Sequence, residues 1–139
     1  MYCAEFSINE KIRDENERRR YIYADIFIMA MIALIYALNA VVIKPDAGGA
    51  FGYFAVCYLD DIMAPCFVLS YVNIVAGAAG LRIRGFAVIE ALSVTMGLFW
   101  ETASQLLKPE AVADPLDIAA CALGGVIYWA LCRRLDDEF

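Results

Sequence analysis

The sequence predicts an all-α integral membrane protein with four transmembrane helices and an interfacial or re-entrant segment after the first. Three observations carry this prediction. Hydrophobic residues make up 63% of the 139 residues, and the mean hydropathy of +0.63 is far above that of soluble proteins. The apolar residues form segments long enough to cross a bilayer, separated by short charged stretches. The basic residues gather in the stretches that would lie on one side.

The chain opens with a polar segment, residues 1–20, which ends in three arginines at positions 18–20. It lacks the apolar core of a cleaved signal peptide, so we expect the first apolar segment to remain as an anchor. Residues 21–43 form this first span, and the arginines would lie at the cytoplasmic headgroups. Asp25 lies in the first turns of the span. We expect it to pair with the arginines or to reach the headgroups.

The stretch after the first span is too long for one membrane helix and too short for two. We therefore interpret residues 51–59 as interfacial or re-entrant and residues 62–81 as the second span. Asp60 and Asp61 lie at the start of that span, where acids cap a helix and interact favourably with its dipole. Two successive acids exceed what one cap needs. Asn73 is expected to hydrogen-bond to another helix.

Residues 86–107 form the predicted third span. At about 100° per residue, one stripe of this helix carries mainly polar and small side chains. The stripe consists of Glu90, Ser93, Gly97, Glu101 and Ser104, with Gln105 at its edge. We expect it to face the interior of the bundle, because a polar group exposed to lipid is costly.

After a short turn at residues 108–113, residues 115–132 form the fourth span. Asp114 is the predicted N-cap of this helix, and Asp117 lies in its first turn. The Gly-Gly pair at 124–125 would let a neighbouring helix approach closely. Residues 133–139 begin with two arginines that close the span and continue as a free tail.

The distribution of basic residues predicts the orientation. Nine of the eleven Lys and Arg residues lie on the side of the two termini, which the positive-inside rule makes cytoplasmic. The chain then has a cytoplasmic polar segment at 1–20, a four-helix transmembrane domain at 21–132 and a cytoplasmic tail at 133–139. Three helices bring polar side chains to or just below the outer surface. These candidate binding residues are Asp60, Asp61, Glu101, Gln105, Asp114 and Asp117.

Charge and composition exclude several classes of function. A net charge of −6 and a pI near 4.5 argue against a basic nucleic-acid surface, and there is no phosphate-binding loop or zinc-finger spacing. Histidine is absent, so acid–base or metal chemistry would depend on carboxylates, Tyr, Lys or Cys. The five cysteines lie mostly in apolar runs, where free Cys behaves as a small hydrophobe; a Cys57–Cys66 pair at an oxidising outer face stays open. No motif calls for a cofactor.

Several of these features occur together in a known family. An acid and a Gln one turn apart, a short turn, an Asp-rich helix entry and a small-residue patch resemble the C-terminal signature of VanZ-like membrane proteins. The matching residues are Glu101, Gln105, Asp114, Asp117, Ala119, Ala120, Gly124 and Gly125. The resemblance covers residues 60–131, with the two acids at 60–61 matching the acidic start of the family's preceding helix. The Trp-Glu pair with the later Asp and Gly-Gly also fits a small family of bacterial membrane proteins of unassigned role.

VanZ-like proteins are associated with low-level resistance to the glycopeptide teicoplanin. The resemblance therefore implies a bacterial cell-envelope role at the outer face of the cytoplasmic membrane. That is the face on which the positive-inside rule places the candidate binding residues.

Three functions stay open for these acids. The favoured one is a non-enzymatic envelope protein that binds a cation, a lipid-linked wall precursor or a partner protein, because no nucleophile or tuned base accompanies the carboxylates. The second is a membrane enzyme acting on a lipid phosphate through Mg²⁺ or Mn²⁺ held by the carboxylates. The third is a structural or assembly subunit, in which the acids cap helices and hydrogen-bond across the bundle. Small-residue patches on the second and fourth spans would also allow a homo-oligomer.

Overall fold

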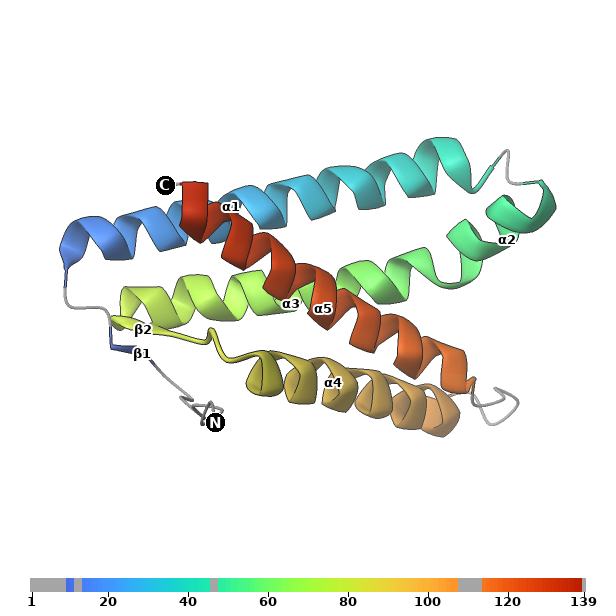
Figure 1. Ribbon diagram of the computed structural model, residues 1–139. Coiled ribbons are helices and arrows are strands. Elements are labelled where there is room, and N and C mark those ends of the chain that lie inside the picture. The colour runs from blue at the N-terminus through green and yellow to red at the C-terminus, as the bar shows by residue number, and fades with distance from the viewer. Residues whose placement is uncertain (1–9, 12–13, 46–47, 108–113, 139) are drawn as a thin grey trace, which may run out of the picture.

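The structure, a computed structural model, describes residues 10–11, 14–45, 48–107 and 114–138. Four of its helices are long and apolar enough to cross a membrane. The chain is therefore an all-α, multi-pass membrane protein, as the sequence predicts (Figure 1). The predicted turn at 108–113 lies outside the described residues.

Helices account for nearly all of the described elements, which follow in this order: β1 (Glu10–Lys11), α1 (Glu15–Leu38), the π-helix η1 (Asn39–Ile43), α2 (Gly49–Cys57), α3 (Leu59–Ala78), β2 (Leu81–Arg82), α4 (Phe86–Leu107) and α5 (Pro115–Glu138).

The first helix begins earlier than the predicted span. The side chain of Asp14 accepts a hydrogen bond from the backbone N–H of Asn16 at 3.1 Å and so caps α1, whose first turn carries Glu15 and Glu17. Acids in a first turn interact favourably with the positive end of the helix dipole. The arginine cluster is therefore helical and continuous with the apolar span. The helix begins almost two turns before the predicted span, because the polar residues ahead of Tyr21 have their own cap.

The first helix ends in a π-helical turn, η1, in which the backbone N–H of Lys44 bonds to the carbonyl of Asn39 at 2.8 Å. Asn39 is fully buried. The segment predicted to be interfacial or re-entrant follows as the nine-residue helix α2, and α3 then starts at Leu59. The short helix α2 is about half the length that a spanning helix needs.

The two ends of the bundle differ. At one end, on the right in Figure 1, α2 packs against η1 and α3, α3 and α5 begin, and α4 ends. We call this the α2 end. At the opposite end, called the β end, β1 pairs antiparallel with β2, with Glu10 opposite Arg82 and Lys11 opposite Leu81.

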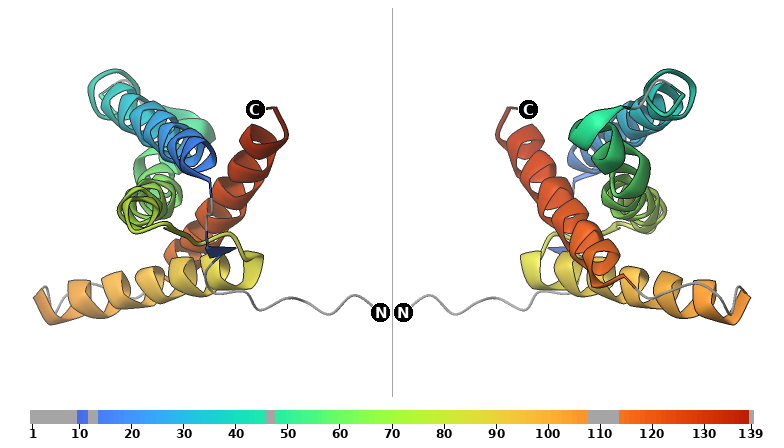
Figure 2. Two further views of the ribbon diagram at one scale, coloured as in Figure 1. Left: turned by 90° about the vertical axis from the view of Figure 1, so that its left-hand side faces the viewer. Right: turned by 90° about the vertical axis from the view of Figure 1, so that its right-hand side faces the viewer.

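The helices pack unevenly around α3. Helix α3 packs against both α1 and α5, and α5 packs against α4, but α1 and α4 make no contact within the described residues. Figure 2 shows α1 and α4 on opposite sides of α3. One side of the bundle is consequently open between α1 and α4.

The Gly-Gly pair of α5 explains how that helix fits between α3 and α4. A Cβ atom on Gly124 would lie 2.2 Å from the carbonyl oxygen of Ile62, and one on Gly125 would lie 2.4 Å from Oγ of Ser93. Neither position has room for a side chain. The close approach predicted from the sequence is thus present, and it involves two neighbouring helices rather than one.

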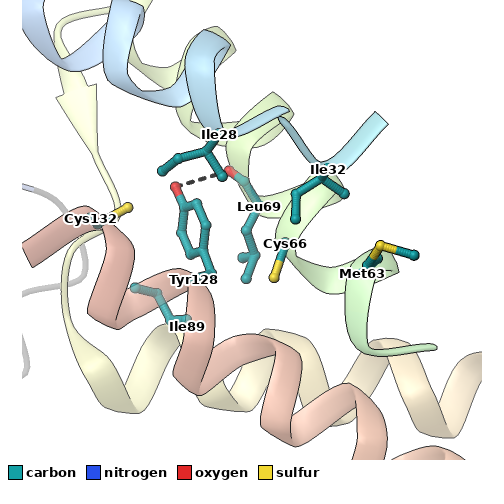
Figure 3. Close-up of a cluster of buried hydrophobic side chains, with 8 residues drawn as sticks. All are labelled: Ile28, Ile32, Met63, Cys66, Leu69, Ile89, Tyr128 and Cys132. Atoms are coloured by element: carbon teal, nitrogen blue, oxygen red, sulfur yellow. Dashed lines mark hydrogen bonds between the residues drawn. The ribbon is translucent and has the colours of Figure 1, made fainter. Parts of the chain in front are cut away.

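A small apolar core lies where α1, α3, α4 and α5 meet (Figure 3). Its buried members are Ile28, Ile32, Met63, Cys66, Leu69, Ile89, Tyr128 and Cys132. Cys57, Cys66, Cys121 and Cys132 are all free, in accord with their expected behaviour as small hydrophobes.

The last helix runs further than expected. It continues through Glu138, so the free tail predicted beyond Arg134 is wrong for the described residues. The side chain of Asp136 is only 6% exposed and accepts a hydrogen bond from Arg82 at 2.8 Å. This buried ion pair gives the end of α5 a fixed partner, which extends the helix beyond the apolar segment.

Candidate functional site

Five of the six candidate binding residues gather at the α2 end, because α3 and α5 start there and α4 ends there. The charges of Asp117, Asp60 and Glu101 act on Asp61, and those of Asp114 and Glu101 act on Asp117. Gln105, the sixth candidate, is exposed and makes no hydrogen bond to the acids among the described residues. The structure therefore brings together acids from three helices, and the amide of Gln105 does not join them.

Asp60 is held by two side chains that the sequence did not single out. Asn39 Nδ2 donates to Asp60 Oδ1 at 3.0 Å and to the carbonyl of Ala55 at 3.2 Å. Lys44 Nζ donates to Asp60 Oδ2, and this hydrogen bond raises the pKa of Lys44 above its ordinary value. Asn39 on η1 thus joins α2 to α3, and Lys44 balances the charge of Asp60.

Glu101 and Asp114 accept hydrogen bonds from backbone N–H groups at the start of α5. Glu101 Oε1 accepts the backbone N–H of Asp114 at 2.8 Å, and Asp114 Oδ1 accepts the N–H of Leu116 at 2.9 Å. The second contact confirms Asp114 as the N-cap of α5. Tyr58 donates to Asp114 Oδ2 at 3.4 Å; desolvation, together with the charge of Asp114, raises the pKa of Tyr58 to about 12. Tyr58 is therefore a neutral donor at physiological pH.

Asp61 and Asp117 differ from the other three acids. Their side chains have no hydrogen-bond or ion-pair partner in the part of the chain that the structure describes. Asp61 is followed after one turn by Pro65, which has no N–H to donate to the carbonyl of Asp61. The carbonyl of Asp61 therefore lacks the N–H donor that the fourth residue along a helix usually supplies.

Asp60 and Asp61 line a groove of about 750 Å³ on the open side of the bundle. We call it the acidic groove. Most of the other lining side chains are apolar: Ile32, Ala33, Tyr36, Val56, Cys57, Met63, Ala64, Phe67, Val68, Met96, Trp100 and Cys121. Helices α1 and α4 form its two walls, α3 lies between them, and α2 covers its end. The acidic groove thus has mostly apolar walls and carries the carboxylates of Asp60 and Asp61 at one end.

The described residues contain no group of three or more His, Cys, Asp or Glu side chains placed to hold a metal ion. The carboxylates at the α2 end are spread between helix caps, the Lys44 pair and the groove. Their arrangement suits a positively charged group that needs one or two acceptors. It does not offer the several converging oxygen ligands that Mg²⁺ or Ca²⁺ takes.

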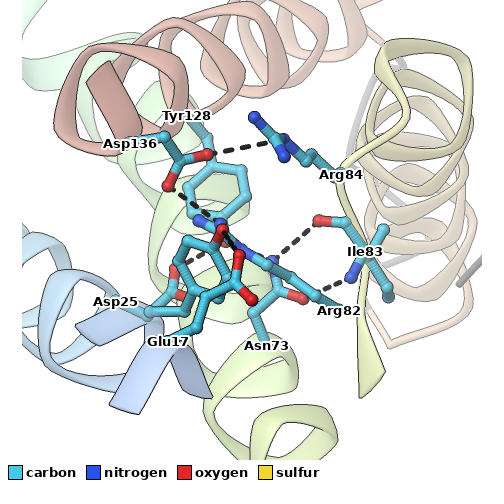
Figure 4. Close-up of polar contacts among 9 residues, drawn as sticks. Glu17, Asp25, Asn73, Arg82, Ile83, Arg84, Tyr128 and Asp136 are labelled. Carbon is cyan, nitrogen blue, oxygen red and sulfur yellow. Dashed lines mark hydrogen bonds and ion pairs between the residues drawn. The ribbon is translucent and has the colours of Figure 1, made fainter. Parts of the chain in front are cut away.

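A second polar cluster, at the β end, was not predicted from the sequence (Figure 4). Tyr128 is fully buried and donates to Asp25 Oδ1 at 2.7 Å, while Asn73 Nδ2 donates to the Tyr128 oxygen at 2.6 Å. Asn73 also exchanges two hydrogen bonds with the backbone of Ile83. The expected hydrogen bond from Asn73 to another helix is confirmed. The expected pairing of Asp25 with the arginines is wrong, because α1 turns Asp25 toward α5.

Arg82 forms the other half of this cluster. Its guanidinium pairs with Asp136 at 2.8 Å and lies 3.8 Å from the ring centroid of Tyr21. Burial works against the charged form, but the hydrogen bond and charge of Asp136 outweigh it and raise the pKa of Arg82. Arg84 reaches the other oxygen of Asp136 at 3.4 Å. The cluster joins α1, α5 and the connection between α3 and α4.

The sequence contains a signal for this cluster, but that signal does not identify which residues pair. Asp25 and Tyr128 are polar side chains inside apolar segments, which marks both as residues that need a partner. They lie 103 residues apart, so only the packing of α1 against α5 identifies the pair.

Comparisons of this chain with protein-family models, with curated proteins and with solved structures found no match.

Proposed function

We propose that this protein is a VanZ-like, non-enzymatic binding protein of the bacterial cell envelope. Its acidic groove faces the outer side of the cytoplasmic membrane and binds a positively charged group there. By this binding it lowers susceptibility to teicoplanin. The observation that carries the proposal is the position of Asp61: a carboxylate that lines an apolar groove and makes no hydrogen bond or ion pair among the described residues.

Two properties of the site support binding over catalysis. An unbalanced carboxylate beside apolar walls attracts cations strongly, because little water screens the charge there. Among the described residues, the acids are not arranged to hold a divalent metal, which a phosphate-transfer reaction at acidic side chains would need to offset charge repulsion. A bound cation would instead balance Asp61 directly.

The outward orientation rests on the positive-inside rule and on the VanZ resemblance. The β end holds Arg82 and Arg84 and both ends of the described chain, whereas Lys44 lies at the α2 end. Placing the β end in the cytoplasm keeps the larger number of basic residues inside. The acidic groove then opens where wall precursors and glycopeptides meet the membrane.

A role as an assembly subunit is the second candidate, and one observation favours it. Glu101 and Asp114 are already engaged with backbone N–H groups at the start of α5, as a purely structural use of acids requires. In that case neutralising Asp61 would leave function intact.

The test is antibiotic susceptibility in a sensitive Gram-positive host that expresses the protein at matched membrane levels. We expect wild type to raise the minimum inhibitory concentration of teicoplanin more than that of vancomycin, and Asp61→Asn to abolish this effect. Glu15→Gln is the matched control, because it removes one exposed negative charge at the β end. Protection that persists in Asp61→Asn would overturn the proposed role of the groove, and absence of protection by wild type would overturn the link to teicoplanin.

A further inference from the structure

We infer that the ligand of the acidic groove is a membrane amphiphile that carries a protonated primary amine beside an apolar chain. The amine pairs with the carboxylate of Asp61, and the chain lies along α3 between α1 and α4. The inference rests on the proposed function and assigns the chemical class of its ligand.

The walls of the groove fit an apolar chain. From Asp61 toward the middle of the membrane, α3 presents Ala64, Phe67 and Val68 to the groove, and α4 faces them with Met96 and Trp100. The volume of about 750 Å³ lies within the range of pockets that hold small organic molecules, which is about 300–1,000 Å³.

The groove is open toward the bilayer. Helices α1 and α4 do not contact each other, and the groove residues Phe67 and Trp100 are 41% and 66% exposed. Spanning helices expose such side chains to lipid. An amphiphile can therefore enter sideways from the bilayer. Its chain moves from one apolar medium to another, and only its head group moves from the membrane surface to the protein.

The charges at the α2 end select an amine. Lys44 pairs with Asp60 and also acts on Asp61, but Asp61 makes no ion pair among the described residues, and the negative charges of Asp117, Asp60 and Glu101 all act on it. An anionic or phosphate head group would be repelled there. A primary ammonium group has three N–H donors, and the oxygens of the Asp61 carboxylate offer it acceptors at the end of the groove.

Trp100 provides a direct readout, because it lines the groove while the other tryptophan, Trp129, packs against Phe86 and is not a lining residue. In Trp129→Phe, Trp100 is the sole tryptophan. The purified protein in phosphatidylcholine nanodiscs is titrated with a long-chain alkylamine brominated on its chain, and separately with the brominated alcohol of equal length. Bromine quenches indole fluorescence only at close range.

We expect the amine to quench Trp100 at about tenfold lower concentration than the alcohol, which corresponds to one charge-assisted hydrogen bond. Asp61→Asn should remove this preference, and Glu15→Gln should keep it. Ala64→Leu should weaken quenching by both probes, because its larger side chain fills the groove. In Trp100→Phe, quenching of Trp129 should not distinguish the probes.

Equal quenching of Trp100 by amine and alcohol would overturn the inference, as would an amine preference that survives Asp61→Asn. The susceptibility test separates this failure from failure of the proposed function. If Asp61→Asn loses teicoplanin protection although the groove does not prefer the amine, the proposed function stands, and the inferred ligand class is replaced by another cation, such as a Lys or Arg side chain of a partner helix. If the amine preference is present but expression of wild type does not change teicoplanin susceptibility, the inferred ligand class is supported and the proposed cellular role is contradicted.

Discussion

The hydroxyl of Tyr128 on α5 donates to the carboxylate of Asp25 on α1 at 2.7 Å, and both side chains are buried in the same layer of the bundle. Because α1 and α5 have few other contacts, this hydrogen bond is a main polar link between them. Asn73 donates to the same hydroxyl and adds α3 to the link. The bundle is therefore stabilised toward the β end by a polar network as well as by apolar packing.

Tyr128→Phe removes this donor while keeping the ring. We expect a loss of about 1–3 kcal/mol in unfolding free energy, because the Asp25 carboxylate stays buried without its partner. Unfolding in mixed micelles with increasing dodecyl sulfate measures the change. Tyr23→Phe is the control, since Tyr23 is 67% exposed and should lose almost nothing. Equal stability of the two variants would show that the network does not hold α1 to α5.

Asp136→Asn tests the fixed end of α5. Arg82 would keep its charge in a site where its side chain is 3% exposed, but it would lose its ion-pair partner. Breaking a buried pair in this way costs about 3–5 kcal/mol. The same unfolding assay applies, with Glu15→Gln as the control for charge removal, because its ion pair with Arg19 is largely exposed. If residues 135–138 were a free tail, Asp136→Asn would match that control.

Gly124→Ala tests the contact between α5 and α3. The added Cβ would meet the carbonyl oxygen of Ile62, which belongs to helix backbone and cannot move alone. Overpacking of this kind costs about 1–3 kcal/mol of unfolding free energy. Gly48→Ala serves as the control, because its Cβ would meet no atom within 4 Å and its φ of −126° suits any residue. Equal stability of Gly124→Ala and the control would show that α5 does not pack this closely against α3.

Alkaline pH should destabilise the α2 end. The pKa of Tyr58 is about 12 in the folded chain against an ordinary value of 10.0, so the unfolded chain loses this proton first as pH rises. The pKa of Lys44 is also raised, and its stabilising pair with Asp60 is lost only at high pH. Stability should therefore be unchanged by these groups below about pH 10 and should fall above it.

Thermal unfolding of detergent-solubilised protein between pH 8 and pH 12 measures this effect. Tyr58→Phe should lose less stability than wild type above about pH 10 and show the same pH dependence below it. Tyr71→Phe, at a lipid-facing position that is 57% exposed, controls for removal of a phenol. Identical alkaline profiles for wild type and Tyr58→Phe would contradict the raised pKa of Tyr58.

Several elements were predictable because their signals are local. The bounds of α4 match the predicted third span, and Asp114 caps α5 as expected, since apolar length and capping residues lie next to each other in the sequence. The convergence of acids at one end followed from the alternating direction of successive spans. Local signals failed at α1, where a polar turn with its own cap extends the helix before the apolar segment begins.

The contacts that give the acids different roles could not be predicted. Asp60 is balanced by Lys44 because a π-helical turn brings Asn39 and Lys44 toward the start of α3, and no pattern in the sequence signals that turn. The groove itself results from α1 and α4 packing on opposite sides of α3. Helix order alone permits other arrangements, so Asp61 could be identified as an acid at a helix entry but not as a lining residue of a groove.

The central claim, that the acidic groove opens at the outer face of the membrane, is tested most directly by labelling Cys57 with a membrane-impermeant maleimide. Cys57 lines the groove at the end of α2 and is partly exposed, whereas Cys66, Cys121 and Cys132 are buried. All variants carry Cys3→Ser, because Cys3 lies in the predicted cytoplasmic segment and would itself react in inverted vesicles. In this background, spheroplasts should be labelled, and the further substitution Cys57→Ser should abolish the labelling. Arg134→Cys in the background without Cys3 and Cys57 should react only in inverted vesicles. Labelling of Cys57 in inverted vesicles but not in spheroplasts would place the groove in the cytoplasm and contradict the claim.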